Sequence, residues 1–284
     1  MSAGPADQVK LGLIGVGIGR SRAPMLHRLA GELSGLTLTY DLIQLESHLA
    51  GDFDQALEAC RSRGYRGVNV TYPFKEHAAE LAEVGSERVR RLGAVNTIRF
   101  DAAAAAQGFN TDYTGFKRAL AARLPDRRPG TVAIIGTGGV GRAIAFGLAD
   151  LGATQLRLFD QDAARSEKLA AAVRAQADVR VCQCRSVEEA AAAADGLVNA
   201  TPVGMHQYPG TPIPRDLIGA QSWAFDAVYT PAQTRFLLDA RSAGLQVISG
   251  YELFFYQGVD AFEVFTGMRV DEARLREALM RSEG

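Results

Sequence analysis

Apolar residues recur in short runs along the second half of the chain, and the segments between these runs carry apolar residues at helical spacing. Short apolar runs are typical of buried strands, and apolar residues every three or four positions are typical of helices. Helices are therefore expected between most of the strands, including 142–149, and the alanine run 190–194 should be helical because of alanine's high helix propensity. The pattern predicts an α/β domain. The strands predicted in this half are 131–135, 155–159, 179–183, 196–199, 223–227 and 246–249.

The first half of the chain has its own alternation, with strands predicted at 9–14, 37–45 and 67–71 and helices at 24–33 and 53–63. This order predicts a second, small α/β domain with a largely parallel sheet. Residues 121–130 contain two prolines and several charges, so they are expected to link the domains. Helices at 254–265 and 270–280 are expected to return to the first domain. The expected domains are 1–112 with 251–284, and 113–250.

A glycine-rich turn follows the predicted strand at 131–135. Gly136, Gly138 and Gly141 have the spacing Gly-x-Gly-x-x-Gly, which binds dinucleotides where it joins a strand to a helix. The first glycine permits a tight bend, the second lets the backbone approach a pyrophosphate, and the third allows close helix packing. The helix N-terminus then faces the phosphate charge. The turn therefore predicts a Rossmann-type dinucleotide-binding domain.

Asp160 follows the next predicted strand, about 20 residues after the fingerprint, where an acidic residue accepts hydrogen bonds from the adenosine ribose hydroxyls. A carboxylate at this position would also repel a 2′-phosphate. The sequence therefore predicts NAD as cofactor in preference to NADP. The alternative is that Asp160 merely begins a turn.

A second glycine cluster, Gly15, Gly17 and Gly19, follows the first predicted strand. Its spacing fails as a fingerprint, because the third glycine would have to occupy position 20, which is Arg20. These glycines are expected to let the backbone approach a small ligand or make a tight connection. One dinucleotide site is therefore expected.

Composition argues against several functional classes. The 284 residues carry 31 Lys and Arg against 32 Asp and Glu, a net charge of −1, so no basic field predicts nucleic-acid or membrane binding. The local basic cluster Arg88, Arg90 and Arg91 is expected to be a solvated helix face. Residues 1–8 lack the features of a signal peptide, and no apolar run reaches transmembrane length. A soluble cytoplasmic protein is expected.

The cysteines and histidines predict neither a disulfide framework nor a metal site. There are only three cysteines, and Cys182 and Cys184 have the wrong spacing for a Cys-x-x-Cys pair. This usage fits a reducing compartment. The four histidines are scattered and form no metal-binding motif.

Lys75 and Asp112 are candidates for proton transfer. Lys75 lies just after a predicted strand and a proline, where open α/β sheets bind ligands, and its ammonium could stabilise or protonate an alkoxide. Asp112 lies among turn-forming residues and could hold such a lysine charged and oriented. The alternatives are a solvated surface lysine and a helix N-cap. Spacing alone does not establish that the two side chains meet.

Several motifs resemble those of the shikimate dehydrogenase family, including its quinate-using members, and the resemblance extends over about residues 11–267. The matching segments are Asn-Val-Thr-x-Pro-x-Lys at 69–75, Gly-Ala-Val-Asn-Thr at 93–97, Asn-Thr-Asp at 110–112, Asn-Ala-Thr-Pro-Val-Gly-Met at 199–205, Asp-Ala-Val-Tyr at 226–229 followed by Pro231, and Gly250 with Gln257.

The resemblance implies that Lys75 and Asp112 form a catalytic pair beside the hydroxyl that is oxidised. It implies that the substrate carboxylate and hydroxyls are held by Ser21, Thr71, Asn96, Tyr229 and Gln257, together with the catalytic pair. Ordinary roles, such as a helix cap for Ser21 or packing for Tyr229, remain alternatives. The cofactor-binding residues would be Gly136, Thr137, Gly138, Gly139, Val140, Gly141, Asp160, Thr201, Pro202, Met205, Ala227, Val228 and Gly250.

Two departures from the family pattern bear on specificity. Many members carry Ser-x-Ser-Pro near the N-terminus, whereas this chain has Ala23 at the second serine position, so one hydroxyl donor is missing. NADP-using members typically place Asn-Arg-Thr where this chain has Asp160 and Gln161, so the arginine for a 2′-phosphate is absent from that position. The chain thus resembles the NAD-using quinate/shikimate and aminoshikimate branches.

The predicted function is NAD-dependent, reversible oxidation of shikimate to 3-dehydroshikimate, with a small cyclohexene or cyclohexane carboxylate as substrate. The alternatives are a quinate or aminoshikimate dehydrogenase, or a homologue that senses nucleotides or ligands without catalysis. Retention of both Lys75 and Asp112 argues against the last alternative. A monomer or a homodimer is expected.

Overall fold

The computed structural model describes residues 8–101, 105–125 and 128–282. The chain divides into two compact units, Met1–Thr111 with Gln257–Gly284, and Asp112–Tyr256. It enters the second unit at the start of α5 (Thr111–Arg123) and leaves it within α10 (Gly250–Thr266). The predicted linker 121–130 is wrong at its start, because 121–123 continue α5. Residues 126 and 127 of that linker lie outside the described residues.

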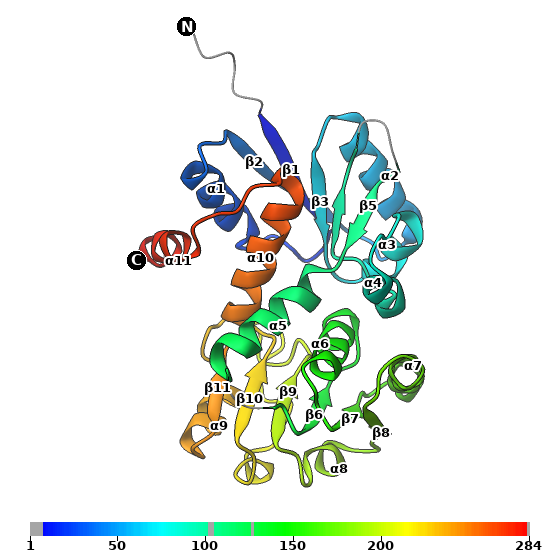
Figure 1. The fold of residues 1–284 in the computed structure, drawn as a ribbon, viewed down its shortest axis with the longest axis vertical. Coiled ribbons are helices and arrows are strands. Elements are labelled where there is room, and N and C mark those ends of the chain that lie inside the picture. Colours follow the sequence, from blue (N-terminus) through cyan, green and yellow to red (C-terminus); the bar gives the residue numbers. More distant parts are fainter. Residues whose placement is uncertain (1–7, 102–104, 126–127, 283–284) are drawn as a thin grey trace, which may run out of the picture. The chain divides into compact units, whose positions relative to one another are not determined.

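The first unit contains a five-stranded sheet in the order β2-β1-β3-β4-β5 (Figure 1). Strands β2, β1 and β3 are parallel, as predicted, whereas β4 runs antiparallel to both β3 and β5. The sequence did not predict β4 and β5, because a strand of three residues is too short to show a period. The strands are β1 (Val9–Val16), β2 (Leu38–Leu45), β3 (Gly67–Val70), β4 (Thr97–Arg99) and β5 (Gln107–Phe109).

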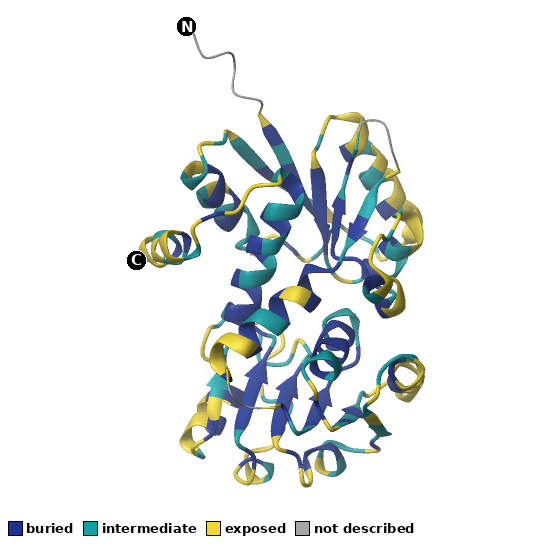
Figure 2. Cartoon of the chain, in the orientation of Figure 1, coloured by how far each residue is buried: buried dark blue, intermediate teal, exposed yellow. Residues whose placement is uncertain are grey.

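Helices cover both faces of this sheet, and its central strands are largely buried (Figure 2). Two clusters of buried apolar side chains form the core of this unit. On one face Ile14 and Val70 pack with Phe53 of α2. On the other face Leu11 packs with Phe265 of α10, so the C-terminal helices belong to this unit, as predicted. The other helices of the unit are α1 (Ala23–Leu33), α2 (Ala50–Ser62), α3 (Lys75–Leu81), α4 (Glu87–Leu92) and α11 (Glu272–Arg281).

The second unit contains a six-stranded, fully parallel sheet, whose strands are all at or within two residues of the predicted positions. In chain order its strands lie 3-2-1-4-5-6, which is the Rossmann order. The direction of winding reverses between β6 and β9, and ligands of such sheets bind at the carboxyl ends of the strands at this point. The strands are β6 (Thr131–Ile135), β7 (Gln155–Phe159), β8 (Arg180–Gln183), β9 (Gly196–Asn199), β10 (Trp223–Asp226) and β11 (Gln246–Ile248).

Adjacent residues of the central strands face opposite sides of this sheet, as strand geometry requires. Ala224 packs with Phe236 of α9, whereas Phe225 meets Phe116 of α5 edge-on, with 5.1 Å between ring centroids. These apolar contacts hold α9 and α5 on the two faces. The remaining helices of the unit are α6 (Gly139–Asp150), α7 (Ala163–Arg174), α8 (Val187–Ala191), the 3₁₀ turn η1 (Arg215–Leu217) and α9 (Arg235–Ser242).

The prediction of a helix through the whole alanine run 190–194 is wrong. Helix α8 ends at Ala191, and Ala193 has a left-handed backbone with φ of 55°. The chain must reverse here, because the N–H of Asp195 already donates to Thr131 O at 2.7 Å, beside β6. Tertiary pairing therefore overrides alanine's helix propensity.

Candidate active site

The glycine turn after β6 has the geometry that a bound pyrophosphate requires. A Cβ atom on Gly136, whose φ is 96°, would lie 2.8 Å from the carbonyl carbon of Ala200, and one on Gly141 would lie 2.1 Å from Gly136 O. A Cβ atom on Gly138 would meet no atom within 4 Å. Packing therefore requires the first and third glycines, and the second leaves the backbone open at the N-terminus of α6. The turn fits a dinucleotide.

Asp160 lies at the carboxyl end of β7, beside this turn. Its Oδ2 accepts hydrogen bonds from the N–H of Thr137 at 2.7 Å and from the Thr137 hydroxyl at 2.8 Å. Its Oδ1 accepts one from the N–H of Asp162 at 3.0 Å. Asp160 does begin a turn, but its carboxylate also joins the end of β7 to the fingerprint. Both properties are compatible with the predicted ribose contact.

A buried amide organises the loop that follows β9. Asn199, which is fully buried, accepts hydrogen bonds at Oδ1 from the N–H of Thr201 at 2.9 Å and from its hydroxyl at 2.7 Å. Further along, the N–H of Met205 donates to Pro202 O at 3.1 Å. The Cγ2 of Thr201 would lie 2.8 Å from a Cβ on Gly136, so this loop meets the glycine turn.

A buried carboxylate organises the loop that follows β10. Asp226 Oδ1 accepts from Asn199 Nδ2 at 2.8 Å and from the N–H of Val228 at 2.9 Å, and its Oδ2 accepts from the Thr234 hydroxyl at 2.5 Å. Burial raises the pKa of Asp226 to about 6, although these hydrogen bonds oppose the rise. Asn199 and Asp226 thus tie together the two loops that carry predicted cofactor residues.

Gly250 brings the start of α10 against the same loop. A Cβ on Gly250 would lie 2.7 Å from Ala227 O and 2.6 Å from Val228 O. The ring of Tyr229 stacks on Phe254 of α10, with centroids 4.9 Å apart and planes 11° apart. All the predicted cofactor residues therefore lie at the carboxyl edge of the second sheet or in the helix ends that meet it.

The predicted substrate residues of the first unit lie at one edge of its sheet. Ser21 follows β1, and its Oγ accepts from the N–H of Ala23 at 3.3 Å, although the N-cap of α1 is Arg22. Thr71 directly follows β3, and Lys75 is the first residue of α3. Lys75 is only 9% exposed, which contradicts the alternative of a solvated surface lysine.

Asn96 joins this edge because β4 runs antiparallel to β3. The N–H of Val95 donates to Lys75 O at 2.8 Å, which places the two segments side by side. Asn96 Oδ1 accepts from the N–H of Thr111 at 2.7 Å, and its Nδ2 donates to Thr111 Oγ1 at 3.0 Å. Asn96 therefore fixes the start of α5, immediately before Asp112.

Asp112 and Gln257 each lie next to the division between the units. Asp112 is 7% exposed and lies in the first turn of α5, one residue inside the helix rather than at its N-cap. Gln257 is half-buried on α10. Asp112 belongs to the second unit and Lys75 to the first, and their pairing stays a prediction.

Several polar residues of the site were not among the predicted site residues. Asn69 Oδ1 accepts from the Tyr40 hydroxyl at 2.8 Å, and its Nδ2 donates to Thr97 Oγ1 at 3.0 Å. Asn199 and Asp226 have the corresponding role in the second unit. One signal was available for Asn69, Asn199 and Asp226, because a polar residue near the end of an otherwise apolar strand needs a buried partner.

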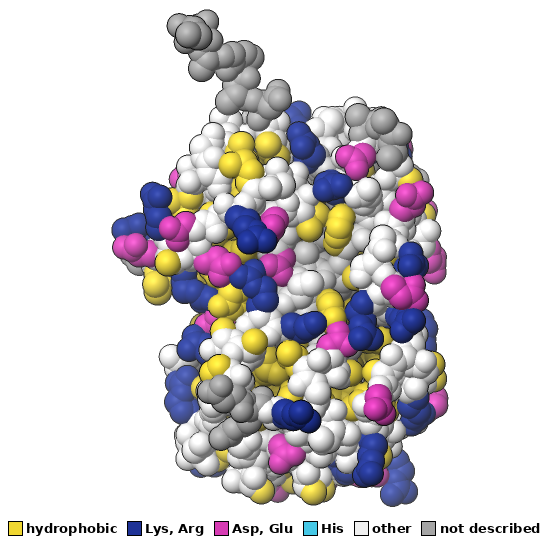
Figure 3. All heavy atoms as spheres, in the orientation of Figure 1, with side chains coloured by type: hydrophobic (Ala, Val, Ile, Leu, Met, Phe, Trp, Pro, Cys, Tyr) yellow, Lys and Arg dark blue, Asp and Glu magenta, His cyan; other side chains and the backbone are white. Residues whose placement is uncertain are grey.

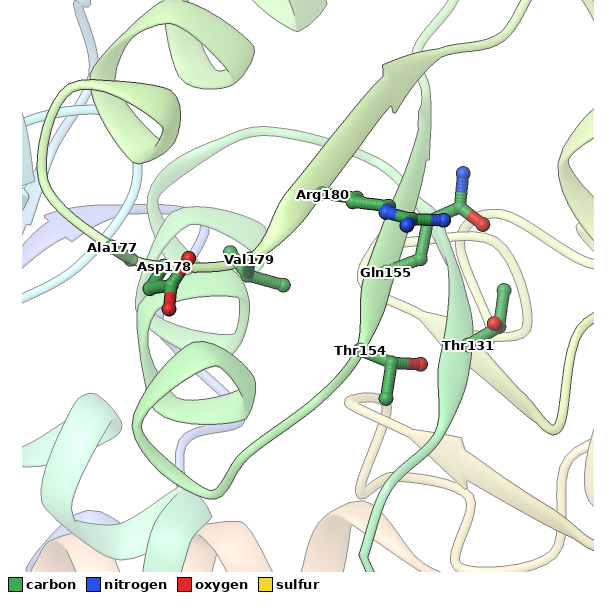
Figure 4. A pocket seen from close by; sticks show the side chains of 7 residues that line it. All are labelled: Thr131, Thr154, Gln155, Ala177, Asp178, Val179 and Arg180. Carbon is green, nitrogen blue, oxygen red and sulfur yellow. The ribbon is translucent and has the colours of Figure 1, made fainter.

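Two pockets lie at opposite edges of the second sheet. A pocket of about 460 Å³ at the carboxyl ends of β7 and β8 is lined by Asp160, Gln161 and Arg185, among others. A pocket of about 550 Å³ lies at the amino ends of β6, β7 and β8, where Figure 4 shows Thr131, Gln155 and Arg180. The first adjoins the fingerprint, so the candidate cofactor site includes it and not the second.

Charge and metal-binding groups add no further site. Basic and acidic side chains are interspersed over the face shown in Figure 3. Across residues 8–101, 105–125 and 128–282, no three His, Cys, Asp or Glu side chains gather as metal ligands would. No helix in this part of the chain is both long and apolar enough to cross a membrane.

The Rossmann strand order, the fitted glycine turn and the acidic residue after β7 define a dinucleotide-binding domain of the kind found in NAD-dependent oxidoreductases. Two family models agree with this class. The shikimate dehydrogenase substrate binding domain matches residues 13–98, and the C-terminal domain of alanine dehydrogenase/PNT matches residues 102–219.

Relatives along nearly the whole chain identify the family. The chain is 40% identical to the quinate/shikimate dehydrogenase (NAD(+)) of Corynebacterium efficiens, over 96% of this chain and 98% of that protein. It is 38% identical to the shikimate dehydrogenase (NADP(+)) of Pseudarthrobacter chlorophenolicus, over 94% and 92%. The solved quinate dehydrogenase from Corynebacterium glutamicum in complex with NAD has a TM-score of 0.86 at 37% identity, over 96% and 99%.

The chain therefore belongs to the shikimate dehydrogenase family and is an oxidoreductase of the type that acts on cyclic hydroxy acids. The predicted family, enzyme class and fold class are confirmed. The first of these relatives and the solved neighbour are both named with NAD, which agrees with the predicted cofactor.

Proposed function

We propose that the protein is an NAD-dependent quinate/shikimate dehydrogenase that reversibly oxidises a ring hydroxyl of shikimate to give 3-dehydroshikimate. The observation that carries the choice of NAD is the Asp160 carboxylate, held beside the fingerprint by Thr137. A fixed negative charge at this position favours two ribose hydroxyls over a 2′-phosphate. The NAD-named relatives support the same choice.

Quinate is the second candidate substrate, because the Corynebacterium efficiens relative carries both substrate names. Because Ala23 stands where many family members have a second serine, this chain has one hydroxyl donor fewer for the substrate carboxylate.

We propose residues 1–112 with 251–284 as the substrate domain and 113–250 as the NAD-binding domain. The substrate-binding family model at residues 13–98 supports the first assignment. A cytoplasmic location completes the proposal.

Lys75 and Asp112 are the proposed catalytic pair. When NAD is bound, it supplies the hydride acceptor. In the oxidation, the substrate carbon loses a hydride and its hydroxyl loses a proton, which the Lys75 amine takes up. In the reverse direction the Lys75 ammonium returns the proton to the carbonyl oxygen. In this proposal Asp112 accepts a hydrogen bond from the Lys75 side-chain nitrogen and keeps that side chain oriented.

The other substrate residues hold the ring in place. Asn96 and Thr71 come from the edge at which Lys75 begins α3, and their side chains bind ring hydroxyls in this proposal. Ser21, Tyr229 and Gln257 bind the carboxylate and the remaining hydroxyls. The buried position of Lys75 supports proton transfer to the substrate, because exchange with bulk water would be slow there.

A steady-state assay tests the proposal. Purified protein is mixed with NAD or NADP and with shikimate, quinate or aminoshikimate, and NADH or NADPH absorbance is followed. We expect turnover with NAD and with shikimate or quinate. Absence of turnover with all three substrates would favour the ligand-sensing alternative.

Substitution of the lysine tests the catalytic pair. Lys75→Ala should lower kcat by roughly a thousandfold, since it removes the proton donor and acceptor. The control is Lys168→Ala, because Lys168 is exposed on α7 and lies outside every proposed site. Near-normal turnover of Lys75→Ala would refute the catalytic assignment.

A further inference from the structure

The hydroxyl of Thr137 contacts Asp160 in a way that the fingerprint does not require. Any residue except proline at position 137 would offer its backbone N–H to Asp160 Oδ2, which Thr137 does at 2.7 Å. The second hydrogen bond to the same oxygen, at 2.8 Å, comes from the threonine side chain. Only a residue with a hydroxyl near its backbone, such as threonine or serine, can form it.

These contacts leave the Asp160 carboxylate little freedom to turn. Oδ2 is held by both groups of Thr137, and Oδ1 accepts from the N–H of Asp162 at 3.0 Å. Thr137 is itself buried, with 3% exposure, so water competes little for its hydroxyl. Because each carboxylate oxygen has further lone pairs, both oxygens can still accept from a ligand.

The pocket beside Asp160 also contains a cation. Arg185, two residues after the end of β8, lines the same pocket of about 460 Å³ with a largely exposed side chain, and its Nε lies 3.4 Å from Glu189 Oε2. A 2′-phosphate in this pocket would be repelled by a fixed Asp160 and attracted by Arg185. Which cofactor is preferred therefore depends on how firmly the carboxylate is held.

We propose that Thr137 is a positioning residue that determines cofactor specificity by holding Asp160 with its side-chain hydroxyl. The held carboxylate accepts hydrogen bonds from the ribose hydroxyls of NAD and occupies the space that the 2′-phosphate of NADP needs. Without the hydroxyl, Asp160 turns away more easily and Arg185 can face the phosphate. This inference rests on the proposed NAD-dependent function.

The experiment compares Thr137→Val, which keeps the shape of the side chain, with Thr137→Ser, which keeps the hydroxyl. The ratio of kcat/KM for NAD to kcat/KM for NADP should fall by roughly tenfold in Thr137→Val. It should return to within about threefold of the wild type in Thr137→Ser. General damage to the fold would lower both activities together, so it cannot by itself produce this fall in the ratio.

Two further measurements separate the possible failures. The dissociation constants of NADH and NADPH, followed by nicotinamide fluorescence, report the same preference without turnover. If the wild type does not turn over but binds NADH more tightly than NADPH, the proposed function fails and the Thr137 comparison still applies. Thr154→Val is the matched control, since Thr154 is exposed at the amino edge of the sheet. An unchanged preference in Thr137→Val, by ratio and by binding, would overturn the inference.

Discussion

Acidification should destabilise the first unit through His27. This side chain lies on α1 with 1% exposure, and its ring stacks on Tyr40 with 4.7 Å between centroids. Its Nδ1 is buried and has no hydrogen-bond partner in the part of the chain that the structure describes. Burial lowers the pKa of His27 from 6.5 to about 3, and the hydrogen bond with Asn69 opposes this only in part. The folded protein therefore holds this imidazole neutral.

The magnitude follows from the two pKa values. Below pH 6.5, the pKa of His27 in the unfolded chain, the unfolded chain binds a proton on this imidazole and the folded chain does not. The free energy of unfolding therefore falls as the pH falls towards about 3. Between about pH 7.5 and about pH 5 the loss amounts to about 2 kcal/mol. Asp226 acts in the opposite direction, because a carboxyl whose pKa is raised from 3.8 to about 6 destabilises the fold as the pH rises. A variant is therefore needed to isolate His27.

The assay is urea unfolding of the wild type and of His27→Phe at about pH 7.5 and about pH 5. Circular dichroism is the appropriate signal, since the single tryptophan, Trp223, lies in the second unit and reports little on α1. The phenylalanine keeps a ring against Tyr40 and cannot be protonated. Any constant cost of the substitution cancels, because only the change with pH is compared.

The wild type should lose about 2 kcal/mol more than His27→Phe over this range. The matched control is His48→Phe, at an exposed position of the same unit, which should lose stability as the wild type does. Equal losses in the wild type and His27→Phe, to within about 0.5 kcal/mol, would refute the reasoning. They would mean that water or a structural adjustment accommodates the imidazolium.

Three further predictions concern charge. Asp160→Ser should raise KM for NAD by roughly tenfold and relieve the repulsion of NADP, and unchanged cofactor selectivity in steady-state kinetics would count against this use of the carboxylate. Burial lowers the pKa of His77, but hydrogen bonds to Asp54 and Glu80 raise it overall, so its contribution is present below pH 6.5 and lost as the pH rises through the folded pKa. His77→Gln should therefore cost under about 1 kcal/mol, more at acidic than at alkaline pH in thermal unfolding; a larger cost at alkaline pH would contradict this. Asp226→Ala leaves three buried donors without their acceptor and should cost about 3 kcal/mol or more in urea unfolding, whereas a loss below about 1 kcal/mol would show that the loops repack.

The second unit was the more predictable part of the fold. Each of its strands shows an apolar run, because a parallel sheet covered by helices is buried on both faces. The turn after β6 could be predicted from three glycines, since packing against Gly136 O and Ala200 leaves no room for a Cβ at two of them. The end of α8 could not be predicted, because it depends on the contact of Asp195 with β6.

The first unit was less predictable where its elements are short. Helix α3 begins at Lys75, directly after a proline segment that the sequence describes only as a turn. Helix α4 does carry local signals, namely Ser86, whose Oγ accepts from the N–H of Val89, and Gly93, which has φ of 65°. Six residues are too few to show a helical period. The helix face expected at Arg88, Arg90 and Arg91 does lie on α4, where Arg90 and Arg91 are exposed and Arg88 is half-buried.

In the candidate site, too, single residues could be predicted from the local sequence, whereas their hydrogen-bond partners could not. Asp160 could be chosen from the sequence because it directly follows a buried strand, and Lys75 because it comes shortly after one, and ligands of open α/β sheets bind at strand ends. The partners of these residues could not, since the sequence gives no register between strands. Thr137 is one residue after Gly136 yet bonds to the end of β7, and Asn199 bonds to Asp226 across two neighbouring strands. Thr137 was predicted only as a cofactor-binding residue, and its bond to Asp160, on which the proposed cofactor specificity rests, is a contact between strand ends that the motif does not show.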